Sequence, residues 1–128
     1  MKILLDTHTF LWWVDGNPAL SAKALEVIRN PRHDCFLSMA SCWEMAIKSS
    51  IGKLTLTMPV ERFVAEQVAE DGFILIPIEF RHVCKVESLP FHHRDPFDRL
   101  LVAQAIMEKM AFVSADTTLD QYGVRRIW

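Results

Sequence analysis

Four carboxylates stand beside the end of an expected strand or the start of an expected helix. Asp6 and Asp116 follow short apolar runs, whereas Glu44 and Asp98 open expected helices. In a parallel α/β sheet, strand C-termini and the helix N-termini that follow them share one edge, so we expect the four carboxylates to converge there. Clustered like charges raise one another's pKa, and a hard cation relieves the repulsion. All-oxygen ligands favour Mg²⁺ or Mn²⁺, and a water activated by such a cation can attack an RNA phosphodiester.

Each acid also has a structural explanation that needs no catalysis. Glu44 completes an S-x-x-E capping box with Ser41, which predicts that a helix starts there. It also precedes Lys48 by four positions, the favourable order for a helical ion pair. The other acids fit turn, cap or helix-dipole positions: Asp6, Asp95, Asp98 and Asp116. Only the combination of acids points to a metal-dependent enzyme.

The elements that must position these carboxylates alternate between strands and helices. Strands are predicted at residues 2–6, 34–39, 73–77, 111–113 and 123–128. Helices are predicted at residues 10–14, from Ser21 to about 30, from 41 to Gly52, 59–71, 81–87 and 96–109. Pro77 places the third strand late in the sheet or at its edge. The alternation predicts an α/β fold with a mostly parallel central sheet and helices on both faces.

Length and composition limit the remaining possibilities. The 128 residues fit a single domain, 1–128, and 51% hydrophobic with 23% charged residues is typical of a compact protein. The net charge of −2 gives no overall basic field for nucleic acid. The three cysteines are odd in number and form no CxxC pair, which indicates reduced thiols in a cytoplasmic protein. No apolar run reaches membrane-spanning length, and no signal-peptide pattern opens the chain.

Four stretches, taken in order, resemble the PIN-domain family, and more narrowly the VapC-type toxins of type II toxin–antitoxin systems. They are Leu4–His8 with Trp12, Ser41–Glu44 with Lys48, Asp95–Ala105, and Ser114–Asp116. They run from the first expected strand to near the end of the chain, so the resemblance covers essentially all of it. In one place the chain carries Ser114 where the family often has threonine, which keeps the hydroxyl.

The resemblance implies a PIN fold and Mg²⁺- or Mn²⁺-dependent endoribonuclease activity. It also implies a cognate antitoxin that blocks the active site, and often a toxin homodimer. By position, Asp6, Glu44, Asp98 and Asp116 match the acidic residues of the family. We expect Asp6 and Asp98 to be the main metal ligands, with Glu44 and Asp116 completing the set directly or through water. Asp95 is interpreted as a capping group beside the site.

Other polar and aromatic residues lead to weaker predictions. The hydroxyls of Thr7 and Ser114 flank two of the acids and are candidates to position a water. Candidates for phosphate contact are Lys48, Arg94 and Arg99, for which a solvated helix face or an ion pair is an equally good explanation. The five histidines show no metal-ligand spacing. The Trp12-Trp13 pair is interpreted as core or protein interface rather than as a base-stacking platform.

There are three alternatives to the nuclease. A phosphatase of the haloacid-dehalogenase type needs a second aspartate two positions after Asp6, and the chain has His8 there. A response-regulator receiver needs an acceptor aspartate after the third strand, which ends instead at Ile76-Pro77. A catalytically silent PIN module that only binds a partner protein stays open.

Overall fold

A parallel five-stranded sheet forms the centre of the computed structural model, which describes residues 1–128. The strand order is β3-β2-β1-β4-β5, so the first strand is central and β3 and β5 are the edges. The strands are β1 (Lys2–Leu5), β2 (Asp34–Ser38), β3 (Ile74–Ile76), β4 (Ala111–Val113) and β5 (Arg126–Ile127). Every neighbouring pair runs parallel, which requires a crossover between each pair of strands.

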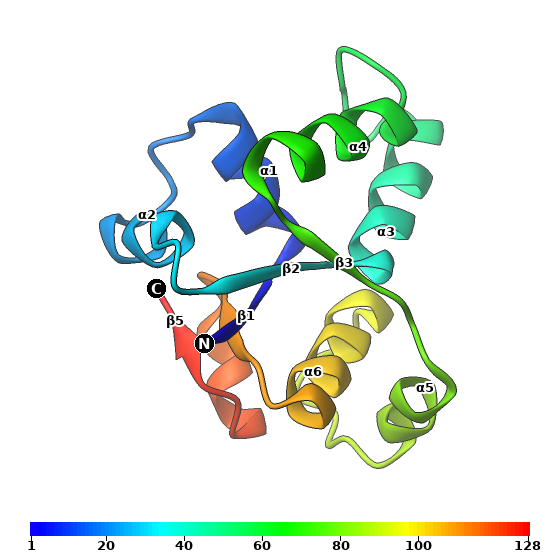
Figure 1. Ribbon diagram of the computed structural model, residues 1–128. Helices are drawn as coiled ribbons and strands as arrows, with labels where there is room; N and C mark the ends of the chain where they lie inside the picture. The colour runs from blue at the N-terminus through cyan, green and yellow to red at the C-terminus, as the bar shows by residue number, and fades with distance from the viewer.

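Helices cover both faces of this sheet, giving three layers (Figure 1). One face carries α1 (Thr7–Asp15), α2 (Ala22–Arg29) and α4 (Val60–Asp71). The other carries α5 (Phe80–Glu87), α6 (Pro96–Glu108) and the 3₁₀ helix η1 (Thr117–Tyr122). The remaining helix, α3 (Met39–Ser50), follows β2 and contacts both α4 and α6. No helix is both long enough and apolar enough to cross a membrane.

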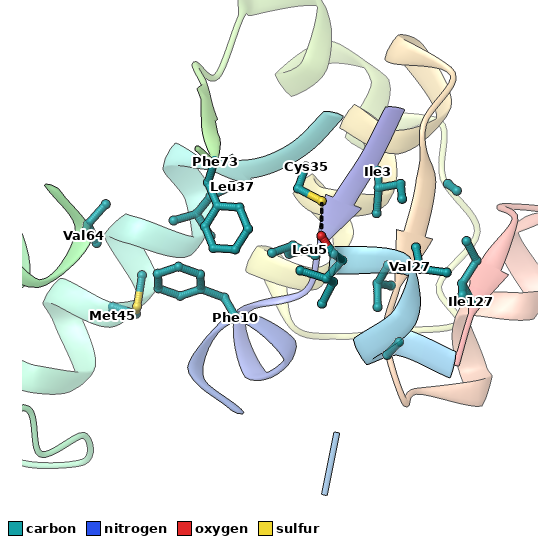
Figure 2. Close-up of a cluster of buried hydrophobic side chains, with 14 of the residues drawn as sticks. Ile3, Leu5, Phe10, Val27, Cys35, Leu37, Met45, Val64, Phe73 and Ile127 are labelled. Atoms are coloured by element: carbon teal, nitrogen blue, oxygen red, sulfur yellow. Dashed lines mark hydrogen bonds between the residues drawn. The ribbon is translucent and has the colours of Figure 1, made fainter. Parts of the chain in front are cut away.

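Successive side chains of the strands point to opposite faces of the sheet and form two separate cores. Ile3 and Leu5 of β1 point to the layer of α1, α2 and α4, where Phe10 is fully buried. In Figure 2 the Phe10 ring lies among Met45, Leu37 and Phe73. Its centroid is 5.9 Å from that of Phe73, an edge-on arrangement that aromatic rings favour. This packing fixes the first turn of α1, which directly follows Asp6.

The second core lies between the sheet and α6. Leu4 and Phe112 point to this face and meet the apolar side of α6, which includes Leu101 and Val102. Asp95 caps this helix, since its Oδ1 accepts from the backbone N–H groups of Phe97 (2.8 Å) and Asp98 (3.3 Å). Helix α6, which carries Asp98 in its first turn, is therefore anchored at its N-terminus and along its length.

The structure confirms the predicted class and most of the predicted elements. The edge position indicated by Pro77 is correct, because β3 is an outer strand. The capping box at Ser41 is wrong: α3 begins at Met39, and Ser38 caps it by accepting from the Ala40 N–H (3.0 Å). Strand β2 delivers Ser38 at its last residue, so the helix starts one turn earlier than the motif indicated. The 3₁₀ helix η1 was missed because it is short and carries no periodic apolar face.

Candidate metal centre

Five carboxylates line one cavity of about 370 Å³ at the C-terminal edge of the sheet. They come from four separate segments of the chain: Asp6, Glu44, Asp95, Asp98 and Asp116. We call this space the acidic cavity. His8, Trp12, Lys48 and Ala115 complete its lining. The four acids predicted from the sequence therefore converge as expected, and Asp95 joins them.

Asp6 is delivered by the end of the central strand and the start of α1. Its backbone N–H donates to the Val113 carbonyl (3.1 Å), which ties the end of β1 to β4. Although Asp6 is the N-cap residue of α1, its carboxylate makes no capping hydrogen bond. Instead, Oδ2 accepts from the Ser114 hydroxyl (2.6 Å). Burial raises the pKa of Asp6, against the lowering effects of the Ser114 hydrogen bond and of His8.

Glu44 is buried one and a half turns into α3 and is paired with a lysine. Its Oε2 lies 2.6 Å from Nζ of Lys48, as the four-residue spacing predicted. The Glu44 side chain is only 5% exposed, whereas that of Lys48 is 38% exposed, so solvent screens the pair from the lysine side. The hydrogen bond raises the pKa of Lys48, which keeps the lysine charged. Lys48 is therefore the one cation of the cavity lining beside its five carboxylates.

Asp98 has the most perturbed carboxyl group of the cavity. No protein group donates a hydrogen bond to its oxygens, and its backbone N–H is already used by the cap at Asp95. Burial, followed by the charges of Asp95, Asp6, Glu44 and Asp116, raises the pKa of Asp98 to about 7. A half-buried carboxylate that is repelled by its neighbours and lacks hydrogen-bond donors is stabilised by a bound cation.

Asp116 is held by contacts on both oxygens. Its Oδ1 accepts from the Thr118 N–H (2.9 Å), capping the 3₁₀ helix as the turn interpretation anticipated. Its Oδ2 lies 2.8 Å from Nε2 of His93, one of the histidines whose spacing indicates no metal site. Donor atoms of His93, Asp98 and Asp116 all lie within 4.8 Å of one another. His93 was missed because spacing along the chain does not reveal that its loop folds back onto the end of β4.

The two hydroxyls expected to position a water have other partners. Thr7 is buried and donates to the Ser41 hydroxyl (2.8 Å), which joins α1 to α3. Ser114 donates to Asp6 and accepts from the Asp116 N–H (3.1 Å). Their role in positioning a water stays a prediction. Ser114 orients the Asp6 carboxylate and ties it to the backbone of Asp116.

The prediction that Arg99 contacts phosphate is wrong. Its side chain is buried in the second core, and its guanidinium donates to backbone carbonyls of the segment that leads into α6: Val86, Leu89, Pro90 and His93. The Phe91 ring covers the guanidinium at 4.1 Å. Arg94 is exposed, and Lys48 lines the acidic cavity. Lys53, which the sequence did not single out, lines an adjoining cavity of about 450 Å³ together with Lys48.

A second group of acids and a histidine lies away from the acidic cavity. His82 is fully buried; its Nδ1 accepts from the Glu79 N–H (3.0 Å) and its Nε2 contacts Glu108 (2.9 Å). The hydrogen bond from His82 lowers the pKa of Glu108. Arg81 pairs with both glutamates. Because this group supplies its own positive charge, it is a structural clamp between α5 and α6 rather than a second metal site.

The donors of the acidic cavity fit a hard divalent cation. Carboxylate oxygens are the ligands that Mg²⁺ and Mn²⁺ prefer. Hydrogen bonds engage one oxygen of Asp6 and one of Glu44, which leaves the other oxygen of each available. Asp98 keeps both of its oxygens. The excess negative charge, the raised pKa of Asp98 and the buried Nε2 of His93 without a hydrogen-bond partner all indicate a cation site here.

The raised pKa of Asp98 leads to a prediction about stability in the presence of a chelator. A carboxyl whose pKa is higher in the folded than in the unfolded state binds its proton more tightly when folded. The penalty for ionising it is therefore absent below pH 4 or so and complete above about pH 7. The free energy of unfolding, measured with urea from pH 5 to 8, should fall less steeply in Asp98→Asn than in the wild type. Equal slopes would contradict the assignment.

Comparison with known proteins identifies the family and the fold of the chain. The chain matches the PIN domain over residues 3–124. VapBC2 from Rickettsia felis, bound to a promoter DNA fragment, is similar in structure with a TM-score of 0.71 at 11% identity, covering 100% of both chains. DNA-bound VapBC from Salmonella typhimurium is similar with a TM-score of 0.71 at 14% identity, and the match covers 98% of this chain and 96% of that one. FitAcB from Neisseria gonorrhoeae is similar with a TM-score of 0.63 at 16% identity, and the match covers 97% of this chain and 95% of that one. No curated protein matches the sequence closely enough to count as a relative.

The family match covers nearly the whole chain, from β1 to the residues just before β5. The chain therefore belongs to the PIN-domain family, in which nuclease activity is typical. The similar solved structures support the same fold.

Proposed function

From membership of the PIN-domain family, we propose that this protein is a Mg²⁺- or Mn²⁺-dependent endoribonuclease and the toxin of a type II toxin–antitoxin pair. The observation that carries the proposal is the convergence of the acids from four segments on the acidic cavity. Such a cluster costs folding free energy unless a cation offsets the repulsion. A catalytically silent binding module would have no need to retain it.

The roles of the acids follow from their contacts. Asp98 and the free oxygen of Asp6 would hold the cation, and Ser114 would keep the Asp6 carboxylate in place. Glu44 and Asp116 would complete the set directly or through water. When bound, a divalent cation lowers the pKa of a coordinated water and stabilises charge on a phosphodiester. Asp95 caps α6 and adds negative charge at the cavity.

Positive side chains beside the acidic cavity would accommodate RNA. Lys48 lines both the acidic cavity and the adjoining cavity, which also carries Lys53. Because Lys48 neutralises Glu44, it lowers the repulsion that the acids exert on an approaching phosphate. We assign Lys48 and Lys53 to phosphate contact in place of the buried Arg99.

A third cavity, of about 490 Å³, would receive the antitoxin. It shares Leu11 and Leu54 with the lysine-lined cavity and Trp12 with the acidic cavity, so the three adjoin one another. Its lining includes the apolar side chains of Met58 and Phe63. A peptide seated here could extend over the catalytic acids. A toxin–antitoxin complex from Klebsiella pneumoniae is similar in structure, with a TM-score of 0.58 at 16% identity, which supports a partner of this kind.

An exposed apolar row on α3 supports the expected homodimer. Four residues at i, i+4 spacing are 37–59% exposed: Met39, Trp43 and Ile47 of α3, and Ile51 at its C-cap. A two-fold interface uses the same surface on both subunits, and ridges at this spacing can pack against a copy of themselves. Sedimentation of the purified chain tests this part of the proposal.

The test of the nuclease is cleavage of a structured RNA by the purified protein with Mg²⁺ or Mn²⁺, and with EDTA. We expect cleavage that requires the cation and is lost in Asp6→Asn, which retains the shape of the side chain and the Ser114 contact. Cation-independent cleavage, or equal cleavage by the variant, would overturn the proposal. A product of an adjacent small reading frame that co-purifies with the chain and suppresses cleavage would support the antitoxin assignment.

A further inference from the structure

His93 lies in a loop that hydrogen bonds and ring contacts hold at the edge of the acidic cavity. Its backbone N–H donates to the Tyr122 hydroxyl (2.8 Å), and its carbonyl accepts from Arg99 (3.5 Å). Its ring stacks on that of Tyr122, with an angle of 9° between the planes and 6.2 Å between centroids. His92 meets the same tyrosine edge-on. The position of the His93 ring is therefore set by contacts from two other elements, α6 and η1.

The Nε2 atom of His93 is buried and has no hydrogen-bond partner. It nevertheless lies 2.8 Å from Oδ2 of Asp116, in an orientation that does not meet hydrogen-bond geometry. A buried polar atom without a partner destabilises the fold, so its presence here needs an explanation. A simple ion pair would turn the N–H towards the carboxylate. Here the two atoms lie side by side instead.

Two atoms that bind the same cation lie close together in this way without a hydrogen bond between them. Ligands about 2.1 Å from an octahedral cation and at right angles to one another are roughly 3 Å apart, close to the separation of Nε2 and Oδ2. The carboxylate of Asp98, which no protein group stabilises by hydrogen bonding, belongs to the same group of donors within 4.8 Å. His93, Asp98 and Asp116 thus present one nitrogen and two carboxylates to a common point.

We propose that Nε2 of His93 is a ligand of the divalent cation, together with Asp98 and Asp116. This inference rests on the proposed function and refines its ligand set, which from the sequence consisted only of oxygens. Imidazole nitrogen suits transition metals such as Mn²⁺ better than it suits Mg²⁺. The mixed donor set therefore makes the site selective for Mn²⁺.

The direct test is pulsed EPR of Mn²⁺ bound to the wild-type protein, without substrate. We expect a ¹⁴N coupling typical of a coordinated imidazole, because nitrogen bound to Mn²⁺ interacts with its unpaired electrons. The coupling should disappear in His93→Gln and persist in His8→Gln, the histidine that lines the acidic cavity itself. Absence of the coupling in the wild type, or its loss only in His8→Gln, would overturn the inference.

Calorimetry with each metal alone provides a second measurement. Removing one nitrogen ligand should weaken Mn²⁺ binding by about 10- to 100-fold and Mg²⁺ binding by much less. His92→Gln is the matched control, because this neighbour also contacts Tyr122 but has no donor in the group around Asp98. Equal losses for the two metals would contradict the assignment. If Mn²⁺ binds and Asp6-dependent cleavage occurs without nitrogen coupling, the nuclease proposal is supported and the assignment of His93 as a ligand is wrong. If no cation binds, both proposals are wrong.

Discussion

Asp98→Asn is expected to lower cation-dependent RNA cleavage by about three orders of magnitude and, in the absence of cation, to stabilise the fold. Metal-ion catalysis contributes several kcal/mol to the barrier, and each 1.36 kcal/mol corresponds to a tenfold change in rate. The same substitution removes a carboxylate that burial and four neighbouring acids destabilise. After allowance for its partial exposure, the gain in the free energy of unfolding is about 1 kcal/mol. Cleavage rates and urea unfolding in EDTA measure the two effects.

Lower cleavage together with higher stability distinguishes a functional acid from a structural one. Asp95→Asn is the matched control, since it removes a charge at the same cavity while asparagine can still cap α6. We expect this variant to retain cleavage to within about tenfold, because Asp95 is not in the proposed ligand set. A loss of stability in Asp98→Asn, or equal losses of cleavage in both variants, would contradict the role given to Asp98.

The sequence predicts the convergence of the acids because that convergence follows from topology. Asp6 and Asp116 each follow a parallel strand, and such strands present their C-terminal ends at one edge. The strand order with β1 at the centre then requires only the right-handed crossovers that such sheets use. The same argument places Asp98, whose helix begins at the Asp95-Pro96 signal. These inferences needed no knowledge of side-chain contacts.

Contacts that depend on loop conformation could not be predicted in this way. His93 lies in the loop between α5 and α6, and nothing in its spacing indicates that it reaches Asp116. Arg99 resembled a surface cation because it follows an acid in an exposed first turn. The direction of its side chain depends on how the preceding loop folds over it. In both cases the missing information is the path of one loop, which periodicity does not encode.

Arg99→Lys is expected to destabilise the protein by about 3 kcal/mol, the range found when a buried charge loses its partners. The planar guanidinium reaches four carbonyls at once, one at the end of α5 and three in the loop that follows, whereas a lysine ammonium has three donors on a single atom. The substitution retains the charge but leaves carbonyls unsatisfied. Urea unfolding measures the loss, with Arg94→Lys, an exposed neighbour, expected to change stability by no more than about 0.5 kcal/mol.

Loss of these contacts should also reach the acidic cavity. Arg99 holds the carbonyl of His93, so loosening the loop releases the ring from its place beside Asp116. We therefore expect Arg99→Lys to weaken Mn²⁺ binding although Arg99 lies outside the cavity lining. Limited proteolysis should cut the segment between α5 and α6 in this variant before any other site. A variant as stable and as resistant to protease as Arg94→Lys would show that the buried guanidinium does not organise this loop.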